Sequence, residues 1–337
     1  MSTEGQPVGH ERDSRLPGPI VSITRWMENL GETGFAYLLL TPVFILLGAI
    51  ALYPLLRTFE LSLFTNVLSD PEFVGLDNYI GLFTGDANSS LPGSITFLPG
   101  LETSSSFPFV HVEGLLRSAL VVTLLFTVVS VFFETIIGFG QALILDQEFR
   151  GRSWVRVAII IPWAIPIVIQ GMIFYLMFHP NTGFLTQYLS SWGIIASTNT
   201  LNDPWSAFLI VTVADIWKTT AFMALLILAG LQSIDRSLYD VARVAGATRW
   251  QQFKLITFPL VLPALGIAIL FRTIDAMRVY GLIDSVSGCT TVPSLSCMVV
   301  ETFNNSRGLA SAIAFVTAAI IGVVVMGVIY QQYKEGL

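Results

Sequence analysis

Apolar runs long enough to cross a lipid bilayer recur along this chain, and they constrain its fold more than any other feature. A helix needs about 20 apolar residues to span the hydrocarbon core, whereas the strands of a membrane barrel show short alternating segments. Of the 337 residues, 53% are hydrophobic and only 12% are charged, which is more apolar surface than a water-soluble domain of this size can bury. We therefore expect an all-α membrane protein, built as a helical bundle, and exclude a soluble multidomain enzyme.

Six apolar runs predict a bundle of six transmembrane helices. The predicted spans cover residues 35–61, 115–145, 157–178, 207–231, 255–279 and 309–331. Residues 1–34 are polar and have no short apolar stretch followed by a small-residue cleavage site, so we interpret them as a cytoplasmic N-terminal tail and not as a signal peptide. Residues 35–337 are then the transmembrane domain.

The positions of Arg and Lys predict the orientation of the bundle, because cytoplasmic loops collect these residues. Eleven of the 17 lie in the tail, after the second and fourth spans, and after the last span, namely Arg12, Arg15, Arg25, Arg150, Arg152, Arg156, Arg236, Arg243, Arg249, Lys254 and Lys334. The connections on the opposite side, residues 65–114, 179–206 and 280–308, hold only Arg307. Both termini are therefore predicted to be cytoplasmic, in the cell (inner or plasma) membrane.

The predicted outer loops carry an insert and two cysteines. Residues 84–112 are rich in Ser, Gly and Pro, and an insert of this kind is either a mobile segment or a surface for a partner. Cys289 and Cys297 are the only cysteines, with seven residues between them. A disulfide here would contribute about 2–3 kcal/mol by closing a short loop, and two free thiols are the alternative, because the sequence does not give the geometry that decides.

Residues for catalysis or for metal binding do not gather in this sequence. The three histidines are scattered over the tail and the outer loops: His10, His111 and His179. We therefore expect no metal site and no histidine-based catalysis. Lys218 and Thr219 follow Trp217 where a phosphate-binding loop needs Gly, so ATP binding by that motif is excluded. The chain also has no basic stripe for nucleic acid.

The connection between the fourth and fifth spans, residues 234–259, holds the most informative pattern. Asp235 or Ser237 can cap a short helix there. Apolar and mostly small side chains then recur at helical spacing on one face: Leu238, Val241, Ala242 and Ala245. A face of small apolar residues suits a preformed groove on a partner. Gly246 permits the turn that would end the helix.

This loop resembles the EAA signature of binding-protein-dependent ABC importer permeases. That signature reads E-A-A-x-x-x-G, nine residues, and then I-x-L-P. The matching positions, with the spacing intact, are Asp240, Val241, Ala242, Gly246, Ile256, Phe258 and Pro259. Asp replaces Glu, Val replaces Ala and Phe replaces Leu, and Ala245 stands where the family commonly has Asp. The amino-acid sequence around the loop is most similar to that of the maltose-type carbohydrate permeases, and the resemblance extends over most of the chain.

The resemblance implies a type I ABC importer permease fold and a set of partners. These would be a second permease subunit, two copies of an ATPase subunit that bind ATP and Mg, and an extracytoplasmic sugar-binding protein, with no cofactor in this chain. The loop would dock into a cleft of the ATPase and transmit its closure to the membrane helices. The residues implied in this coupling are Asp240, Val241, Ala242, Arg243, Gly246, Ala247 and Pro259.

Ionisable residues within the predicted spans call for an explanation, because an unpaired charge in the bilayer is costly. They are Glu134, Asp215, Lys218, Arg272, Asp275 and Arg278. Two pairs have i, i+3 spacing, Asp215 with Lys218 and Arg272 with Asp275, so each charge could be satisfied within its own helix. The alternative is that these residues line a polar path for a hydroxyl-rich solute.

Resemblance to the maltose-type permeases places the solute path at particular positions: Lys218, Thr219, Phe222, Arg272, Asp275, Ala276 and Val279. We interpret the chain as a non-catalytic permease subunit that moves a sugar, a di- or oligosaccharide such as maltose or trehalose, by alternating access. A permease for a monosaccharide or glycerol phosphate is one alternative. A secondary transporter driven by an ion gradient, or a membrane scaffold that does not transport, are the others.

Overall fold

The computed structural model describes residues 31–65, 67, 70–93, 95–99, 112–193 and 200–334. The predicted tail, up to residue 30, lies outside the described residues, as do residues 94 and 100–111 of the 84–112 insert. The chain divides into two compact units, Met1–Thr58 and Phe59–Leu337. Each unit is described by itself.

The first unit consists, in its described part, of one long apolar helix. It is composed of α2 (Glu32–Leu47), the π-helical turn η1 (Gly48–Leu52) and the start of α3 (Tyr53–Ser62). The 30 residues Thr33–Ser62 are long and apolar enough to cross a membrane, and they coincide with the first predicted span. Pro42 lies inside α2, a position that membrane helices tolerate better than soluble ones.

Helices also dominate the described part of the second unit. They are α4 (Asp77–Thr84), α5 (Val112–Leu116), α6 (Ala119–Asp146), α7 (Arg152–Ala164), α8 (Ile167–Phe178), α9 (Phe184–Ser191), α10 (Pro204–Gln232), α11 (Arg236–Val244), α12 (Arg249–Gln252), α13 (Phe258–Ala276), α14 (Gly281–Val286), α15 (Leu295–Phe303) and α16 (Arg307–Lys334). Two short turns accompany them, the 3₁₀ turn η2 (Asp86–Ser90) and the π-helical turn η3 (Phe253–Thr257). A small antiparallel ladder, β1 (Phe64–Thr65) with β2 (Glu72–Phe73), pairs Phe64 with Phe73.

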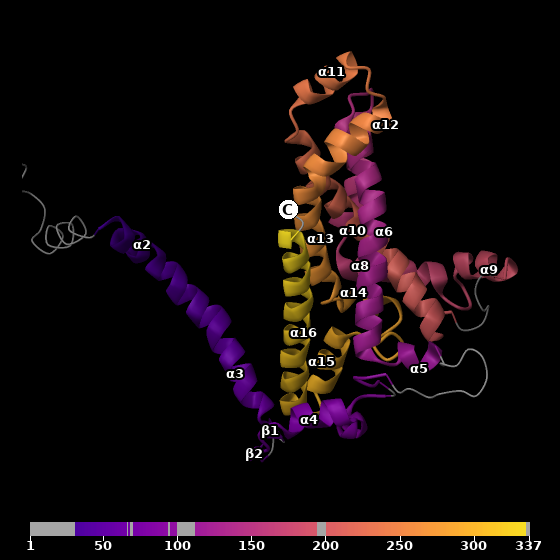
Figure 1. Ribbon diagram of the computed structural model, residues 1–337. Coiled ribbons are helices and arrows are strands. Elements are labelled where there is room, and N and C mark those ends of the chain that lie inside the picture. The colour runs from indigo at the N-terminus through magenta and orange to yellow at the C-terminus, as the bar shows by residue number, and fades with distance from the viewer. Residues whose placement is uncertain are drawn as a thin grey trace, which may run out of the picture. The chain divides into compact units, whose positions relative to one another are not determined.

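The long helices α6, α10, α13 and α16 form the body of the second unit, and α10 packs against both α6 and α13 (Figure 1). Close approach depends on glycine at these contacts. A Cβ added to Gly138 of α6 would lie 2.8 Å from the Met223 Cβ of α10, and one added to Gly230 would lie 2.4 Å from the Ala264 Cβ of α13. Small residues at such contacts let membrane helices pack closely, where the hydrophobic effect supplies little driving force.

The third predicted span, residues 157–178, is not the single straight helix that the sequence suggested. The structure breaks it into α7 and α8, which are bent by 92° at residues 165–166. Pro166 explains the break, because a proline disfavours helical backbone in the residue before it, and Ile165 is extended, with φ −73° and ψ 129°. The described residues therefore contain five helices able to cross a membrane and one bent pair able to count as a sixth.

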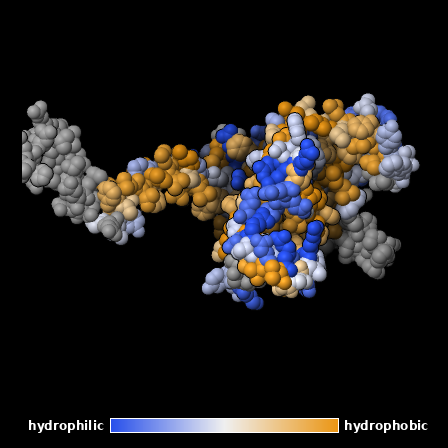
Figure 2. All heavy atoms as spheres, turned by 90° about the horizontal axis from the view of Figure 1, so that it is seen from above, coloured by the Kyte–Doolittle hydropathy of each residue, from blue (hydrophilic) through white to orange (hydrophobic). Residues whose placement is uncertain are grey.

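The two ends of the second unit differ in character. Helices α11 and α12 lie at one end, whereas α4, α5 and the small ladder lie at the other (Figure 1). Seen onto the α11 end, hydrophilic residues gather over the middle of the face and hydrophobic residues surround them (Figure 2). A polar end surrounded by apolar flanks is what a bundle needs to sit across a bilayer.

Candidate functional site

Helix α11, at one end of the bundle, is fixed at its N-terminus by charged and polar contacts. The Asp235 Oδ1 atom accepts a hydrogen bond of 2.9 Å from the Ser237 backbone N–H, and this bond lowers the pKa of Asp235 below its ordinary value. The next residue, Arg236, forms a 2.6 Å ion pair with Asp146 at the end of α6. The helix is therefore capped and tied to a long helix of the bundle.

Gly246 makes the turn that ends α11, as the sequence pattern predicted. Its φ is +82°, in the left-handed region that favours glycine. The Gly246 N–H donates to the Arg243 carbonyl at 3.0 Å and the Ala247 N–H donates to the Ala242 carbonyl at 2.9 Å, which satisfies two carbonyls at the helix end. Within the described part of the chain, no group other than the adjacent residues lies within 4 Å of a Cβ built on Gly246. The residue is therefore required by the backbone conformation and not by lack of space.

The outward side of α11 is ordered, exposed and partly apolar. Of the face that the sequence suggested, Val241 is 69% exposed and Leu238 is 43% exposed. Val244, which belongs to neither that face nor the signature, is 92% exposed. Asp240 and Arg243 pair with each other and are both exposed. The opposite side is anchored by Tyr239.

The Tyr239 hydroxyl lies 2.9 Å from the Thr257 hydroxyl, so the anchored side of α11 touches the helix that continues into the membrane bundle. The Ala247 carbonyl accepts a 2.9 Å bond from the Gln252 side chain. Pro259, the last residue of the signature, is at the start of α13, directly after η3. The loop and the long helix Arg249–Ala276 are thus one continuous unit.

A buried cluster of charges joins three helices deep in the bundle. Arg272 of α13 donates through Nε and one terminal nitrogen to the carboxylate of Glu134 on α6, the second bond measuring 3.0 Å. The same terminal nitrogen contacts Asp215 of α10. The side chains of Arg272, Glu134 and Asp215 are 2%, 0% and 9% exposed. A guanidinium offers a planar fork of donors that matches carboxylates.

Two further groups complete this cluster. The Thr219 hydroxyl of α10 lies 2.6 Å from Glu134 Oε1 and 2.6 Å from the Asp215 carbonyl. The remaining terminal nitrogen of Arg272 donates at 3.0 Å to Asp275, whose side chain is 75% exposed. Every nitrogen of the guanidinium is therefore bound to a carboxylate, and one of those carboxylates reaches the surface of the chain.

The sequence offers two i, i+3 pairs that could neutralise the intramembrane charges within one helix, and the described part of the structure contains only one of them. The local pairing of Arg272 with Asp275 is present. Among the described salt bridges, Asp215 pairs with Arg272 and not with Lys218. Sequence spacing could not reveal this contact, because the two residues are 57 positions apart. The sequence predicts Glu134 as an intramembrane charge, with a role only in the ion-driven alternative and none in the solute path, because its partner Arg272 is 138 positions away.

The predicted solute-path positions divide into a buried and an accessible group. Ala276 and Val279 are 1% and 8% exposed, and Thr219 and Arg272 are buried in the cluster. Lys218 and Phe222 of α10 are half-buried and Asp275 is exposed. Trp163 of α7 stacks on Phe222, with ring centroids 6.3 Å apart and planes at 23°.

Trp163 is not among the solute-path residues predicted from the sequence, because no sequence pattern indicates that α7 approaches α10 there. It is 46% exposed. The accessible groups at these positions are two rings, an amine and a carboxylate, contributed by α7, α10 and α13, and we call them together the accessible edge. Such a combination can stack on a ring and hydrogen-bond to hydroxyl groups.

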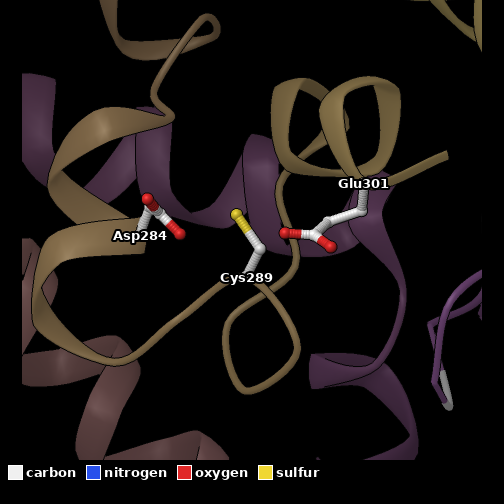
Figure 3. A group of neighbouring side chains, drawn as sticks. All are labelled: Asp284, Cys289 and Glu301. Carbon is white, nitrogen blue, oxygen red and sulfur yellow. The ribbon is translucent and has the colours of Figure 1, made fainter. Parts of the chain in front are cut away.

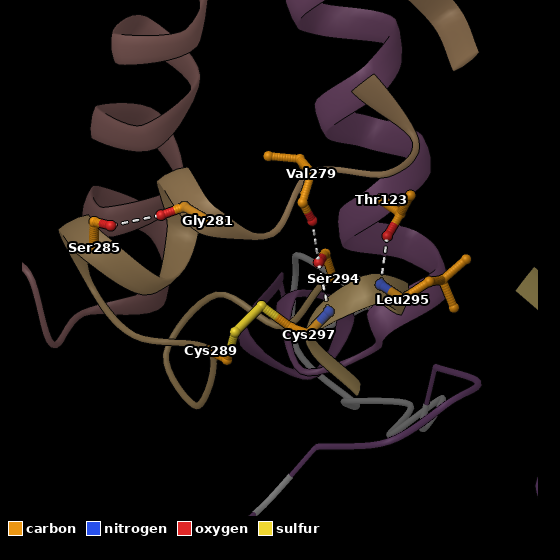
Figure 4. Close-up of a disulfide and its surroundings, with 8 residues drawn as sticks. All are labelled: Thr123, Val279, Gly281, Ser285, Cys289, Ser294, Leu295 and Cys297. Atoms are coloured by element: carbon orange, nitrogen blue, oxygen red, sulfur yellow. Dashed lines mark hydrogen bonds between the residues drawn. A yellow bond between two sulfur atoms is a disulfide. The ribbon is translucent and has the colours of Figure 1, made fainter. Parts of the chain in front are cut away.

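Cys289 and Cys297, whose state the sequence left open, are joined by a disulfide (Figure 4). Both residues are buried. Ser294 caps α15 beside them: its hydroxyl donates to the Val279 carbonyl at 2.7 Å and accepts from the Cys297 N–H at 3.0 Å. The Leu295 N–H donates to the Thr123 hydroxyl of α6 at 2.9 Å. The segment after α13 is therefore fixed to the bundle.

One group of side chains in the described part of the chain has ligand atoms close enough to share a metal ion: Asp284, Cys289 and Glu301 (Figure 3). Their ligand atoms lie within 4.8 Å of one another. The sulfur of Cys289 is held in the disulfide, and a thiolate, not a disulfide, is the sulfur ligand that metals bind. Two carboxylates remain, which is too few to define a metal site.

Comparison with known proteins adds a family and several relatives. The family model described as "Binding-protein-dependent transport system inner membrane component" matches residues 134–334. That range contains the charge cluster, the α11 loop and the disulfide. The trehalose/maltose transport system permease protein MalF of Thermococcus litoralis is 35% identical over 298 residues, covering 86% of this chain and 90% of the relative.

Two further relatives carry transport names. The sulfoquinovosyl glycerol transport system permease protein SmoG of Agrobacterium fabrum is 32% identical, over 88% of this chain and 89% of the relative. The trehalose transport system permease protein SugA of Mycobacterium tuberculosis is 31% identical, over 79% and 76%. Among solved structures, a chain of a bacterial ABC transporter that imports alginate has the same fold, with a TM-score of 0.67 and 22% identity over 94% of this chain and 98% of that chain.

Proposed function

The chain belongs to the family of binding-protein-dependent transport system inner membrane components, and from that premise we propose which solute it conducts and how it is driven. As a member, it is the permease subunit of an ABC importer, a multi-pass inner-membrane protein that leaves ATP hydrolysis to a partner. We propose that its solute is a neutral di- or oligosaccharide such as trehalose or maltose.

The sugar assignment is supported by the relatives and by the accessible edge of the bundle. Two of the named relatives are called trehalose or trehalose/maltose permeases. The edge offers stacked rings from Trp163 and Phe222 and polar groups from Lys218 and Asp275. Aromatic faces and hydrogen-bonding groups together suit a ring that carries several hydroxyls.

A neutral solute fits this edge better than a phosphorylated one. Every nitrogen of Arg272 is bound to a carboxylate inside the protein, so the guanidinium is not available to a phosphate. The accessible charges are then the Asp275 carboxylate and the Lys218 ammonium, which are opposite in sign and can accept hydrogen bonds from hydroxyls and donate to them, respectively. The seven positions of the predicted solute path keep this role as a proposal, with Asp275, Lys218 and Phe222 as its accessible members.

For the drive, we propose that α11 inserts into a cleft of the ATPase partner. The observation that carries this proposal is the combination of a complete signature spacing with a capped, tied and outward-facing α11. Asp240, Val241, Ala242, Arg243, Gly246, Ala247 and Pro259 are the residues proposed to act in coupling. The α11 end and both termini would then be cytoplasmic. The complex would hold a second permease subunit, two ATPase copies that bind ATP and Mg, and an extracytoplasmic sugar-binding protein, with no cofactor in this chain.

Replacing Gly246 with Glu tests the coupling role. Glu cannot adopt φ +82° without strain, so α11 would lose its turn, and we expect trehalose or maltose uptake to fall at least about tenfold, as is typical of a lost coupling contact. The measurement is uptake of labelled sugar into cells, with membrane abundance of the chain followed in parallel. Gly151→Glu is the matched control, because Gly151 also has a positive φ, +93°, and open space around it.

One further variant and two further measurements make the result decisive. Gly246→Asn should keep most of the uptake, because Asn tolerates the left-handed conformation. Equal uptake by Gly246→Glu and the unaltered chain would contradict the docking role.

Normal uptake of an anionic sugar with none of either neutral disaccharide would contradict the solute assignment. Gentle affinity purification from the native membrane should recover an ATPase and a second permease, and recovery of the chain alone would contradict the proposed complex.

A further inference from the structure

Trp250, four residues after Gly246, is a large apolar side chain held in an exposed and ordered position. It is 70% exposed. The segment that carries it is fixed by a capping box, in which Thr248 accepts from the Gln251 N–H at 3.3 Å and the Gln251 side chain accepts from the Thr248 N–H at 2.8 Å. Tryptophan is one of the residues enriched among those that contribute most of the binding energy of protein–protein contacts.

An unbroken run of aromatic contacts leads inward from Trp250. Its ring stacks on Phe253, with centroids 5.4 Å apart and planes at 19°. Phe253 meets Phe139 of α6 edge-on, at 5.9 Å and 87°. Phe258 lies beside both, 6.1 Å from Phe253 and 6.4 Å from Phe139. We call Trp250, Phe253 and Phe139 the aromatic chain.

Phe139 brings the aromatic chain to the part of α6 that holds the buried charge cluster and packs closely against α10. It is five residues from Glu134, which holds Arg272 in the buried charge cluster. Between them lies Gly138, where α6 touches the backbone of α10 so closely that an added Cβ would be 3.1 Å from the Ala224 nitrogen. A shift of the α6 backbone at Phe139 would therefore press the neighbouring Gly138 against α10, because closely packed contacts transmit strain.

The helix that carries Phe253 has a local irregularity at the same place. Residues Phe253–Thr257 form the π-helical turn η3, and the Phe253 carbonyl accepts a bond from the Phe258 N–H. Turns of this kind are uncommon and are frequent at functional sites. The irregularity lies between the outward-facing loop and the long helix α13, where a movement of one relative to the other would be taken up.

We propose that Trp250 is a second contact for the ATPase partner beside α11, and that the aromatic chain transmits its displacement to α6 and so to the three-helix charge cluster. The inference rests on the proposed docking of α11. It adds a partner contact outside the signature residues. It also adds a route into α6, a helix that the loop itself does not belong to. Trp250, Phe253 and Phe139 are thus positioning residues that act through α6.

The test uses the complete transporter in proteoliposomes, with sugar uptake and ATP hydrolysis measured together. Leu substitutions keep apolar volume, so we compare Trp250→Leu, Phe253→Leu and Phe139→Leu. Each is expected to lower sugar moved per ATP hydrolysed by about fivefold, a size typical of weakened coupling, while the complex still assembles. Trp154→Leu is the control, because Trp154 is 80% exposed at the start of α7 and stands outside the aromatic chain.

A double substitution distinguishes a serial route from separate effects. The Trp250→Leu, Phe139→Leu double variant should lose no more coupling than the stronger single variant, because residues that act in series are not additive. Additive losses would overturn the proposed route. An unchanged ratio in all three single variants would overturn the inference as a whole.

Two other results distinguish this inference from a lipid-anchoring role of Trp250 and from a failure of the α11 docking. Loss of membrane abundance in Trp250→Leu with an unchanged ratio would identify Trp250 as a lipid-interface anchor and overturn the contact with the ATPase. Gly246→Glu is assayed in the same vesicles: if it abolishes uptake while the aromatic variants behave normally, the docking of α11 stands and only the aromatic chain fails. Normal uptake by Gly246→Glu would contradict the docking itself.

Discussion

Arg272 shows how one residue can control the stability of the helix bundle. It is fully buried among Glu134, Asp215 and Asp275, and it comes from a different helix than two of its partners. Burying a charge in a bilayer-spanning bundle costs free energy that only good geometry and several hydrogen bonds offset. The cluster is therefore sensitive to loss of one member, whereas the exposed Asp275 contributes as surface ion pairs do.

Arg272→Ala should lower the free energy of unfolding by about 3–5 kcal/mol, because two buried carboxylates would lose their partner. The measurement is denaturant titration of the purified chain in detergent micelles. Asp275→Asn is the control and should change that free energy by less than about 1 kcal/mol, since its side chain is 75% exposed. Equal stability of Arg272→Ala and the unaltered chain would show that the cluster does not hold the three helices together.

At the scale of elements, the helices are defined by apolar length but are fitted together by small residues. Two glycines of α6 make this visible. Gly138 faces α10, and a Cβ there would lie 2.8 Å from the Met223 Cβ, whereas a Cβ on Gly140 would have no described side chain or neighbouring helix within 4 Å. Both positions are in the interior of the same helix. They differ in what packs against them.

Gly138→Ala and Gly140→Ala should therefore change stability in opposite directions. The first should destabilise by about 1–3 kcal/mol through overpacking against α10. The second should stabilise by up to about 1 kcal/mol, because Ala is a better helix former than Gly. Unfolding midpoints of the two variants, measured side by side in the same detergent, decide the matter. A destabilised Gly140→Ala would mean that another subunit packs on that face.

For the whole molecule, the main property is the side on which each end of the bundle lies. The distribution of Arg and Lys predicts that the α11 end is cytoplasmic. The disulfide lies in the segment between α13 and α16, which this topology places toward the outer face, and oxidising compartments are where disulfides persist. The two inferences are independent and agree.

Single introduced cysteines should report this topology directly. Val244→Cys, at a site that is 92% exposed on α11 of the isolated chain, should not react with a membrane-impermeant maleimide in intact cells and should react in opened membranes from which the proposed ATPase partner has been removed. Asn304→Cys, exposed after α15, should react in intact cells. The native cysteines form a disulfide and should give little background. Reaction of Val244→Cys in intact cells would reverse the proposed orientation.

The sequence determined the membrane class, five of the spans and the α11 loop. Spans follow from the bilayer, which imposes a minimum apolar length on any helix that crosses it. The loop follows from local rules, because a cap at Asp235 and a left-handed Gly246 act within a few residues of each other. Such features can be predicted from the sequence because the residues that interact are close together along the chain.

Only the tertiary structure decided the features that join distant parts of the chain. These are the bend at residues 165–166, the contact of Trp163 with Phe222, the disulfide, and the pairing of Asp215 with Arg272 across 57 positions. Apolar length cannot distinguish a straight span from a broken one, and helical spacing offers Asp215 a nearby Lys218 that it does not use. Which partner a buried charge or ring finds depends on how the helices pack, and packing is a property of the whole bundle.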